Sequence, residues 1–359
     1  MTSEKGILIQ NIYYMLAYAF QELRQNNYAE IAGENFEEIY DLFAEILARG
    51  ISFQLKQGLH RDYIHRNESL NTLRGKIDLN ETISLKSRKS NHIACEFDEL
   101  SENNIYNRII VSTVNILLKH SSVREKSKSA LKRQMLFFSN VQPIEIKDIH
   151  WNTLRFDRNN RSYRMLLYIC YFILDGLLMT TEDGKYKMRE FSDDHMNRLF
   201  EKFVLEFYRR HHPSLKARAE QIKWNLDRDY SKNSENVLPI MQTDIMLSIG
   251  ERTLIIDTKY YGQTMQQQFN KSTIHSNNLY QIHTYVTEHD LNGTGRVDGM
   301  LLYAKTQEGI VPDGQMKLAR GNTISFRTLD LNQDFTGIKK SLDAFINKYD
   351  TTTGKPTKH

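Results

Sequence analysis

The first hundred residues contain two different patterns of apolar positions. Between residues 11 and 49, apolar side chains recur three or four positions apart, which predicts two helices joined around Ala32 and Gly33. Short, β-rich or alternating runs follow at Ile51–Leu55, Asp62–His65, Gly75–Leu79 and Ser90–Asp98. These runs predict a small β-sheet or partial barrel, and helical spacing returns at residues 104–118.

The second half of the chain alternates helical and strand patterns. Helical periodicity extends over residues 162–179, 193–210, 278–288 and 338–349. Strands enclosed by helices predict a mixed central sheet flanked by helices. A polar, loop-like segment at residues 157–161 precedes this pattern. We therefore expect an α+β domain over residues 1–158, an α/β domain over 159–350 and a polar tail over 351–359.

The composition is that of a soluble globular chain with room for two domains. Its 359 residues are 40% hydrophobic and 26% charged. A net charge of +4 provides no strong global field, so any contact with DNA must be local or shared with a partner. The two cysteines have no zinc or redox spacing, which fits a cytoplasmic protein. The longest apolar run, residues 165–179, contains Asp175 and is too short to cross a membrane.

A β-hairpin is predicted around the Gly-Glu pair at positions 250–251. Two β-rich runs flank this pair, and a glycine in the first central position suits a two-residue type II′ turn. With the turn centred there, Ile249 faces Arg252. Counting outward along the two strands then places Asp244 opposite Asp257.

Asp244, Asp257 and Lys259 together predict a metal-dependent phosphodiesterase site. Opposed carboxylates on an antiparallel pair lie about 5 Å apart and repel each other unless a cation lies between them. Mg²⁺ prefers oxygen ligands and takes one or two protein carboxylates, which leaves positions for water and a phosphate. Lys259 shares a strand face with Asp257, and its charge can hold the attacking water. The alternative is a surface hairpin whose Asp and Lys are solvated or paired with each other.

Three further polar residues are candidates for the same site. Glu201 falls within the apolar face of the helix expected at 193–210, so it is a candidate third metal ligand, with an ordinary salt bridge as the alternative. Gln281 and Tyr285 share one helix face and could hydrogen-bond the site or the DNA backbone, or could be ordinary polar positions. The sequence contains no G-x-x-x-x-G-K-[ST] loop, so we do not expect it to hydrolyse a nucleoside triphosphate.

The order of these residues resembles a known nuclease pattern. Pro239, Asp244 and the Asp257-Thr-Lys259 run resemble the active-site motif of the PD-(D/E)xK nuclease superfamily. The Gln281-x-x-x-Tyr285 pair resembles the Gln/Tyr motif of the RecB-like branch, and Glu201 lies where these enzymes often carry a helix Glu. The resemblance implies a restriction-endonuclease-like α/β fold for the second half of the chain.

Short blocks spread over nearly the whole chain carry a closer resemblance. They are Asn11–Tyr18, Gly58–Leu59, Arg74–Ile77, Phe97–Glu99, Asn107–Ile110, Phe200–Phe203, Thr243–Asp244, Asp257–Tyr261 and Asn278–Gln281. In their order and spacing they resemble the McrC family, the nuclease subunits of McrBC 5-methylcytosine-dependent restriction systems.

This second resemblance implies a partner and a division of labour. The expected partner is an McrB-like AAA+ GTPase ring, which uses the GTP and recognises modified DNA. The N-terminal half would insert into that ring and stimulate GTP hydrolysis. The C-terminal half would cut double-stranded DNA carrying modified cytosine, with Mg²⁺ held by Asp244, Asp257 and Glu201. Self-association within the complex stays open, and the alternatives are a catalytically silent GTPase-activating subunit or a stand-alone DNA repair nuclease.

Overall fold

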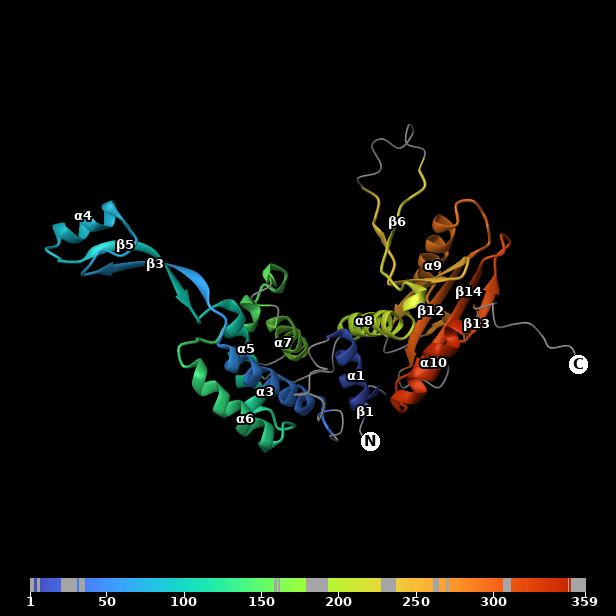
Figure 1. The fold of residues 1–359 in the computed structure, drawn as a ribbon, viewed down its shortest axis with the longest axis horizontal. Coiled ribbons are helices and arrows are strands. Elements are labelled where there is room, and N and C mark those ends of the chain that lie inside the picture. Colours follow the sequence, from blue (N-terminus) through green and yellow to red (C-terminus); the bar gives the residue numbers. More distant parts are fainter. Residues whose placement is uncertain are drawn as a thin grey trace, which may run out of the picture. The chain divides into compact units, whose positions relative to one another are not determined.

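The chain forms two compact units in the computed structural model (Figure 1). It describes residues 3–4, 7–20, 31, 36–157, 160, 162–178, 193–226, 237–260, 265–268, 271–305, 311–347 and 349. Met1–Ile39 and Glu190–His359 make up the first unit, which we call the sheet unit. Tyr40–Arg189 make up the second, which we call the arm unit. The structure therefore divides the chain elsewhere than at the expected boundary after residue 158.

The body of the arm unit is a cluster of helices. Its helices are α3 (Ile39–Gln57), α5 (Ile105–Lys119), α6 (Glu125–Met135) and α7 (Tyr163–Leu178). Short 3₁₀ turns lie at Leu136–Phe138, Ile146–Asp148 and Trp151–Thr153. The strand predicted at Ile51–Leu55 is wrong, because α3 continues through it to Gln57. Ile51 is fully buried one helical turn after the equally buried Leu47, so the helical spacing of buried residues continues through the segment that alternates like a strand.

A three-stranded antiparallel sheet extends from these helices as an arm (Figure 1). The arm consists of β3 (Asp62–Leu70), β4 (Lys76–Ile77), helix α4 (Leu79–Ser87) and β5 (Ile93–Ser101), with β5 in the centre of the sheet. The strands predicted at residues 62–65 and 90–98 therefore lie in or overlap β3 and β5. The strand predicted at 75–79 shortens to β4, because Asp78 caps α4 by accepting a hydrogen bond from the Glu81 backbone N–H.

The sheet unit is built around a five-stranded mixed sheet with the order β13-β14-β12-β9-β8. Its strands are β8 (Ile245–Ile249), β9 (Arg252–Lys259), β12 (Val297–Lys305), β13 (Gly314–Lys317) and β14 (Thr323–Asp330). The central strands β9, β12 and β14 run parallel, while the edge strands β8 and β13 are antiparallel to their neighbours. This arrangement confirms the predicted mixed central sheet.

Helices and short strand pairs surround this sheet. The helices are α1 (Ile9–Ala19), α8 (Asp193–His211), α9 (Ser276–His289) and α10 (Phe335–Asn347), with a 3₁₀ turn at Pro213–Leu215. The short strands are β1 (Ser3–Glu4), β2 (Ile7–Leu8), β6 (Gln221–Ile222), β7 (Met241–Gln242), β10 (Met265–Gln268) and β11 (Lys271–Ile274). They pair as β1 with β2, β6 with β7, and β10 with β11.

Helix α9 covers one face of the sheet. At Gly299 on β12, an added Cβ atom would lie 2.8 Å from Ile282 and 2.9 Å from Val286, so glycine allows the helix to approach closely. Side chains alternate along a strand, so Asp298 points to the opposite face. Ser325 shares that opposite face and contacts Tyr349, just beyond α10, with 2.9 Å between the hydroxyl oxygens.

Long-range contacts hold the first helix in the sheet unit. The Asn11 amide on α1 donates to the Leu331 backbone oxygen at 2.8 Å, and the Tyr18 hydroxyl lies 2.7 Å from His211 Nε2 on α8. The ring of Tyr18 also packs edge-on against Phe203. No helix in the described part of the chain combines the length and apolar character needed to cross a bilayer.

Candidate active site

The β8–β9 hairpin brings the two predicted carboxylates to one end of the sheet. Ile249 pairs with Arg252 and Ile245 with Ile256, which confirms the predicted register. The turn glycine at position 250 has φ +58°, as the first central residue of a type II′ turn requires. The pairing ends at Ile245 and Ile256, and Asp244 and Asp257 are the next residues along the two chain segments.

Asp257 is completely buried, and its hydrogen-bonding capacity is not used. The residue has 0% solvent exposure. Lys259 Nζ lies 2.8 Å from Asp257 Oδ2 in an ion pair, yet neither Asp257 oxygen meets the geometry of a hydrogen bond with any described group. Leaving a buried carboxylate oxygen without a hydrogen-bond donor is costly. Asp257 therefore remains the candidate cation ligand that the sequence predicted.

Asp244 is fixed by the strand that carries Asp257. Its Oδ2 atom accepts hydrogen bonds from the Thr258 backbone N–H at 2.7 Å and from the Thr258 hydroxyl at 2.8 Å. Just before Asp244, the buried Thr243 hydroxyl donates to the Glu220 backbone oxygen at 2.9 Å. These contacts hold Asp244 at the end of β8 and leave its other carboxylate oxygen available.

A chain of hydrogen bonds connects Lys259 to helix α9 and β7. Lys259 Nζ donates to Gln281 Oε1 at 3.2 Å, and Gln281 Nε2 donates to the Tyr285 hydroxyl at 2.9 Å. The Tyr285 hydroxyl in turn donates to the Gln242 backbone oxygen at 3.0 Å. The structure thus brings Gln281 and Tyr285 to the site, where they position the lysine ammonium group.

Burial and mutual repulsion raise the pKa values of the acidic residues. Burial, reinforced by the charge of Asp244, raises the pKa of Asp257 to about 7, and Lys259 opposes this rise. Burial also raises the pKa of Asp244, against the opposing hydrogen bonds from Thr258. Carboxyl groups that resist ionisation in this way are characteristic of a site that a cation completes.

Glu201 approaches the two aspartates from helix α8. Burial, followed by the charges of Asp244 and Asp257, raises its pKa to about 7. The three carboxyl groups are therefore near enough to repel one another. Among the described residues, however, no three His, Cys, Asp or Glu side chains converge closely enough to hold a metal ion together. The role of Glu201 as a third ligand stays a prediction.

Comparison with known proteins identifies the family. The family model for McrBC 5-methylcytosine restriction system components matches residues 3–304. The chain belongs to this family. It is 29% identical over 352 residues to a protein of Escherichia coli (strain K12) described as the type IV methyl-directed restriction enzyme EcoKMcrBC, with 96% of this chain and 98% of the relative covered.

A solved structure matches the fold of this McrBC family member. It comes from an assembly of Thermococcus gammatolerans McrB AAA+ hexamers with bound McrC, and the TM-score is 0.52 at 20% sequence identity. The match covers 94% of this chain and 76% of the other. At this level of identity the likeness concerns the fold.

Sequence reasoning missed two positioning residues of this family member. The Asn197 side-chain oxygen accepts a hydrogen bond from the Tyr260 backbone N–H at 2.9 Å, directly after Lys259. Asn197 precedes Glu201 by one helical turn on α8, and this i, i+4 spacing was the available signal. Thr258 was also missed, because an alternating strand pattern places its side chain on the face away from Asp257.

Proposed function

We propose that this chain is the DNA-cleaving subunit of a GTP-dependent restriction complex directed at modified cytosine. The observation that carries the proposal is Asp257, which is fully buried beside Asp244 and Lys259 with no hydrogen bond to its oxygens from any described group. Membership of the McrBC restriction family supports the same activity. The hairpin and helix contacts fit a PD-(D/E)xK endonuclease arrangement within the mixed sheet.

Asp244 and Asp257 are suited to bind Mg²⁺. Both supply hard carboxylate oxygens at the end of the hairpin away from its turn, and Mg²⁺ commonly takes one or two protein carboxylates. When bound, Mg²⁺ would supply Lewis acidity toward a DNA phosphate and lower the pKa of bound water. The repulsion that raises the pKa of Asp257 would then be relieved, because a cation would occupy the space between the carboxylates.

Lys259 is the residue that we assign to the attacking water. Its ammonium group is only 13% exposed and is held by Gln281 on one side and Asp257 on the other. A cation fixed in this way can orient a water molecule and offset negative charge on the phosphate as it is attacked. Glu201, with its pKa raised to about 7, is placed to accept a proton near neutral pH.

We assign the contact with an McrB-like AAA+ GTPase ring to the arm. Several large apolar side chains are exposed there: Tyr63 at 71%, Leu73 at 59%, Leu79 at 64%, Ile83 at 63% and Leu100 at 49%. Leu79 and Ile83 lie on one side of α4, and exposed apolar groups gathered on a small element are typical of a protein contact. The Thermococcus assembly, which contains McrB hexamers with bound McrC, supports such a partner. Cytoplasmic location and self-association remain predictions.

The test is cleavage of methylated plasmid by the full chain with its GTPase partner, GTP and Mg²⁺. Asp257→Asn should reduce cleavage at least a thousandfold while stimulation of GTP hydrolysis persists. Glu251→Gln is the matched control, since it removes a carboxylate that is 80% exposed at the far end of the same hairpin. A Leu79→Ser/Ile83→Ser double variant should show the reverse pattern, with stimulation of the GTPase reduced.

The rival functions give different results in the same assay. Cleavage by a clean Asp257→Asn preparation would show that the active site lies elsewhere. Wild-type chain that stimulates GTP hydrolysis and never cuts DNA would be a silent regulatory subunit. Cleavage that needs neither the GTPase nor GTP would favour a repair nuclease.

A further inference from the structure

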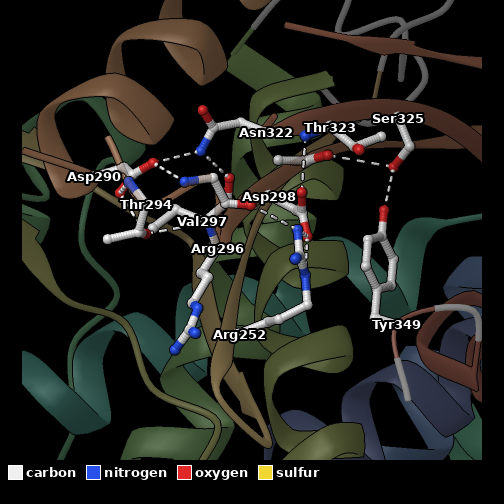
Figure 2. Close-up of polar contacts among 12 residues, drawn as sticks. Arg252, Asp290, Thr294, Arg296, Val297, Asp298, Asn322, Thr323, Ser325 and Tyr349 are labelled. Atoms are coloured by element: carbon white, nitrogen blue, oxygen red, sulfur yellow. Dashed lines mark hydrogen bonds and ion pairs between the residues drawn. The ribbon is translucent and has the colours of Figure 1, made fainter. Parts of the chain in front are cut away.

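A polar cavity lies on the face of the sheet opposite to the one that bears Asp257. Its volume is about 270 Å³, and the residues that line it include Arg252, Asp298, Gln315, Thr323, Arg327 and Tyr349. They come from β9, β12, β13 and β14, and Tyr349 follows the end of α10. Figure 2 shows Arg252, Asp298, Thr323 and Tyr349 together. Two arginines in one cavity indicate a site for an anion.

Both carboxylate oxygens of Asp298, which lines this cavity, accept hydrogen bonds from the protein. Asp298 Oδ2 accepts from Arg252 Nε at 2.8 Å and from Nη2 at 2.6 Å, while Oδ1 accepts from the Thr323 backbone N–H at 2.8 Å (Figure 2). Arg252 Nη2 also donates to the Gly295 backbone oxygen. Asp298 therefore fixes the guanidinium group, and Nη1 of Arg252 bonds no group in the described part of the chain.

Arg327 is the second fixed guanidinium group, and it is only 9% exposed. Its Nη1 atom donates to Asp313 at 2.7 Å and to the Gly314 backbone oxygen at 2.8 Å. The Nη2 atom makes only a long contact of 3.4 Å with Gln315, and Nε bonds no acceptor among the described residues. Asp313 is 76% exposed, so water weakens its hold on the arginine.

The remaining groups in the cavity favour an oxyanion. Guanidinium donors on Arg252 and Arg327 that bond no described residue match the several acceptor oxygens of a phosphate. The Tyr349 hydroxyl lies beside them, 2.9 Å from Ser325 Oγ. Burial, together with the charge of Asp298, raises the pKa of Tyr349, while the hydrogen bond with Ser325 and the charges of Arg327 and Arg252 lower it, as expected if these groups face one space.

The position of the cavity argues for a small ligand instead of the DNA substrate. Arg252, at one end of the cavity, precedes Asp257 by five residues on β9, which is about 17 Å along a strand, whereas Arg327 is level with Thr258. The cavity also opens on the face that bears Asp298, whereas Asp257 and Lys259 share the face covered by α9. We propose that this cavity binds the phosphate group of a small ligand, either inorganic phosphate or a nucleoside monophosphate.

Calorimetric titration of the full chain with inorganic phosphate and with dCMP tests this proposal. EDTA is present and ionic strength is constant, so that phosphate cannot bind through Mg²⁺ at the other site. Arg327→Lys keeps the charge and loses the planar fork, and it should weaken binding at least tenfold. Asp313→Asn removes the carboxylate that competes for Arg327 and should tighten binding about threefold. Arg320→Lys, an exposed arginine nearby that does not line the cavity, is the control.

Each outcome decides the question. Saturable binding with opposite effects of the two variants supports the proposal, and tighter binding of dCMP than of phosphate identifies a nucleotide as the ligand. No saturable binding by the wild-type chain overturns it. The proposal is also overturned if Arg327→Lys weakens the binding of duplex DNA and leaves the affinity for phosphate unchanged. If Arg327→Lys does not fold, Asp313→Asn alone decides, and unchanged affinity in that variant overturns the proposal.

Discussion

The two ends of the five-stranded sheet each bury an aspartate, and the two residues are held in opposite ways. Asp298 is 1% exposed and Asp257 is 0% exposed, and each lies close to one cation. Asp298 accepts hydrogen bonds on both oxygens, from Arg252 and from the Thr323 backbone. Asp257 has only the ion pair with Lys259, and no described group donates a hydrogen bond to either oxygen.

We interpret this difference as one between a carboxylate with a structural role and one that is a candidate for a functional role. Burying a charge is tolerated when the charge is paired and its lone pairs are satisfied, as they are at Asp298. A buried carboxylate that lacks those bonds destabilises the fold and persists where a ligand uses it. Burial alone would not distinguish the two residues, whereas counting the hydrogen bonds to each oxygen does.

Replacing Asp298 should have the largest effect on the stability of the chain. In Asp298→Asn the guanidinium of Arg252 would lose its anionic partner inside the sheet unit. The free energy of unfolding should fall by about 3 kcal/mol, as is usual when one partner of a buried pair is removed. Urea unfolding of the full chain in EDTA measures this change, with Glu251→Gln as the exposed control. A loss below about 1 kcal/mol would mean that Asp298 contributes no more than a surface pair.

Asp257→Asn should raise the free energy of unfolding in the absence of metal, whereas Asp298→Asn lowers it. The substitution removes a buried negative charge that repels Asp244, so we expect the free energy of unfolding to rise by about 1–2 kcal/mol at pH 8. Adding Mg²⁺ should then stabilise the wild-type chain and leave the variant unchanged. Destabilisation of the metal-free variant would show that Asp257 has the same structural role as Asp298.

The pH dependence of stability sharpens the same contrast. The pKa of Asp257 is raised to about 7 from an ordinary value of 3.8, so the folded state binds more protons than the unfolded state between these values. The contribution of Asp257 to the free energy of unfolding is fully present below pH 4 and is lost as the pH rises through 7. We expect the wild-type chain in EDTA to lose about 1 kcal/mol more than Asp257→Asn between pH 5 and pH 8. Parallel pH profiles in urea unfolding would contradict this assignment.

The hairpin could be predicted from the sequence because the residues that determine its turn and register are close together in the chain. The Gly250 turn fixes the register, and the register places Asp244 opposite Asp257. The helix spacing of Gln281 and Tyr285 likewise predicted that they share one face of their helix, and the structure joins them by a hydrogen bond. The run at residues 51–55 misled the prediction, because five residues can satisfy strand alternation while they continue a helix.

Other features depend on contacts between distant parts of the chain. The Asn11 amide bonds a backbone oxygen 320 positions away, and no local pattern encodes that the first helix belongs to the sheet unit. The pairing of Arg252 with Asp298 requires β9 and β12 to lie side by side, although α9 separates them in the sequence. Unsatisfied oxygens on Asp257 also become visible only after every neighbouring donor has a position.

The smallest expected effect concerns the hydroxyl group that supports Lys259 through Gln281. Tyr285→Phe removes the hydroxyl that accepts from Gln281 and donates to the Gln242 backbone oxygen, while the buried ring remains. One such hydrogen bond contributes about 1 kcal/mol, so cleavage by the complex should fall about fivefold with stability nearly unchanged. Thr287→Val on the same helix is the control, because its hydroxyl bonds only the preceding turn at His283. A Tyr285→Phe chain that cuts at the wild-type rate would show that Asp257 and Gln281 hold the ammonium group without help from this hydroxyl.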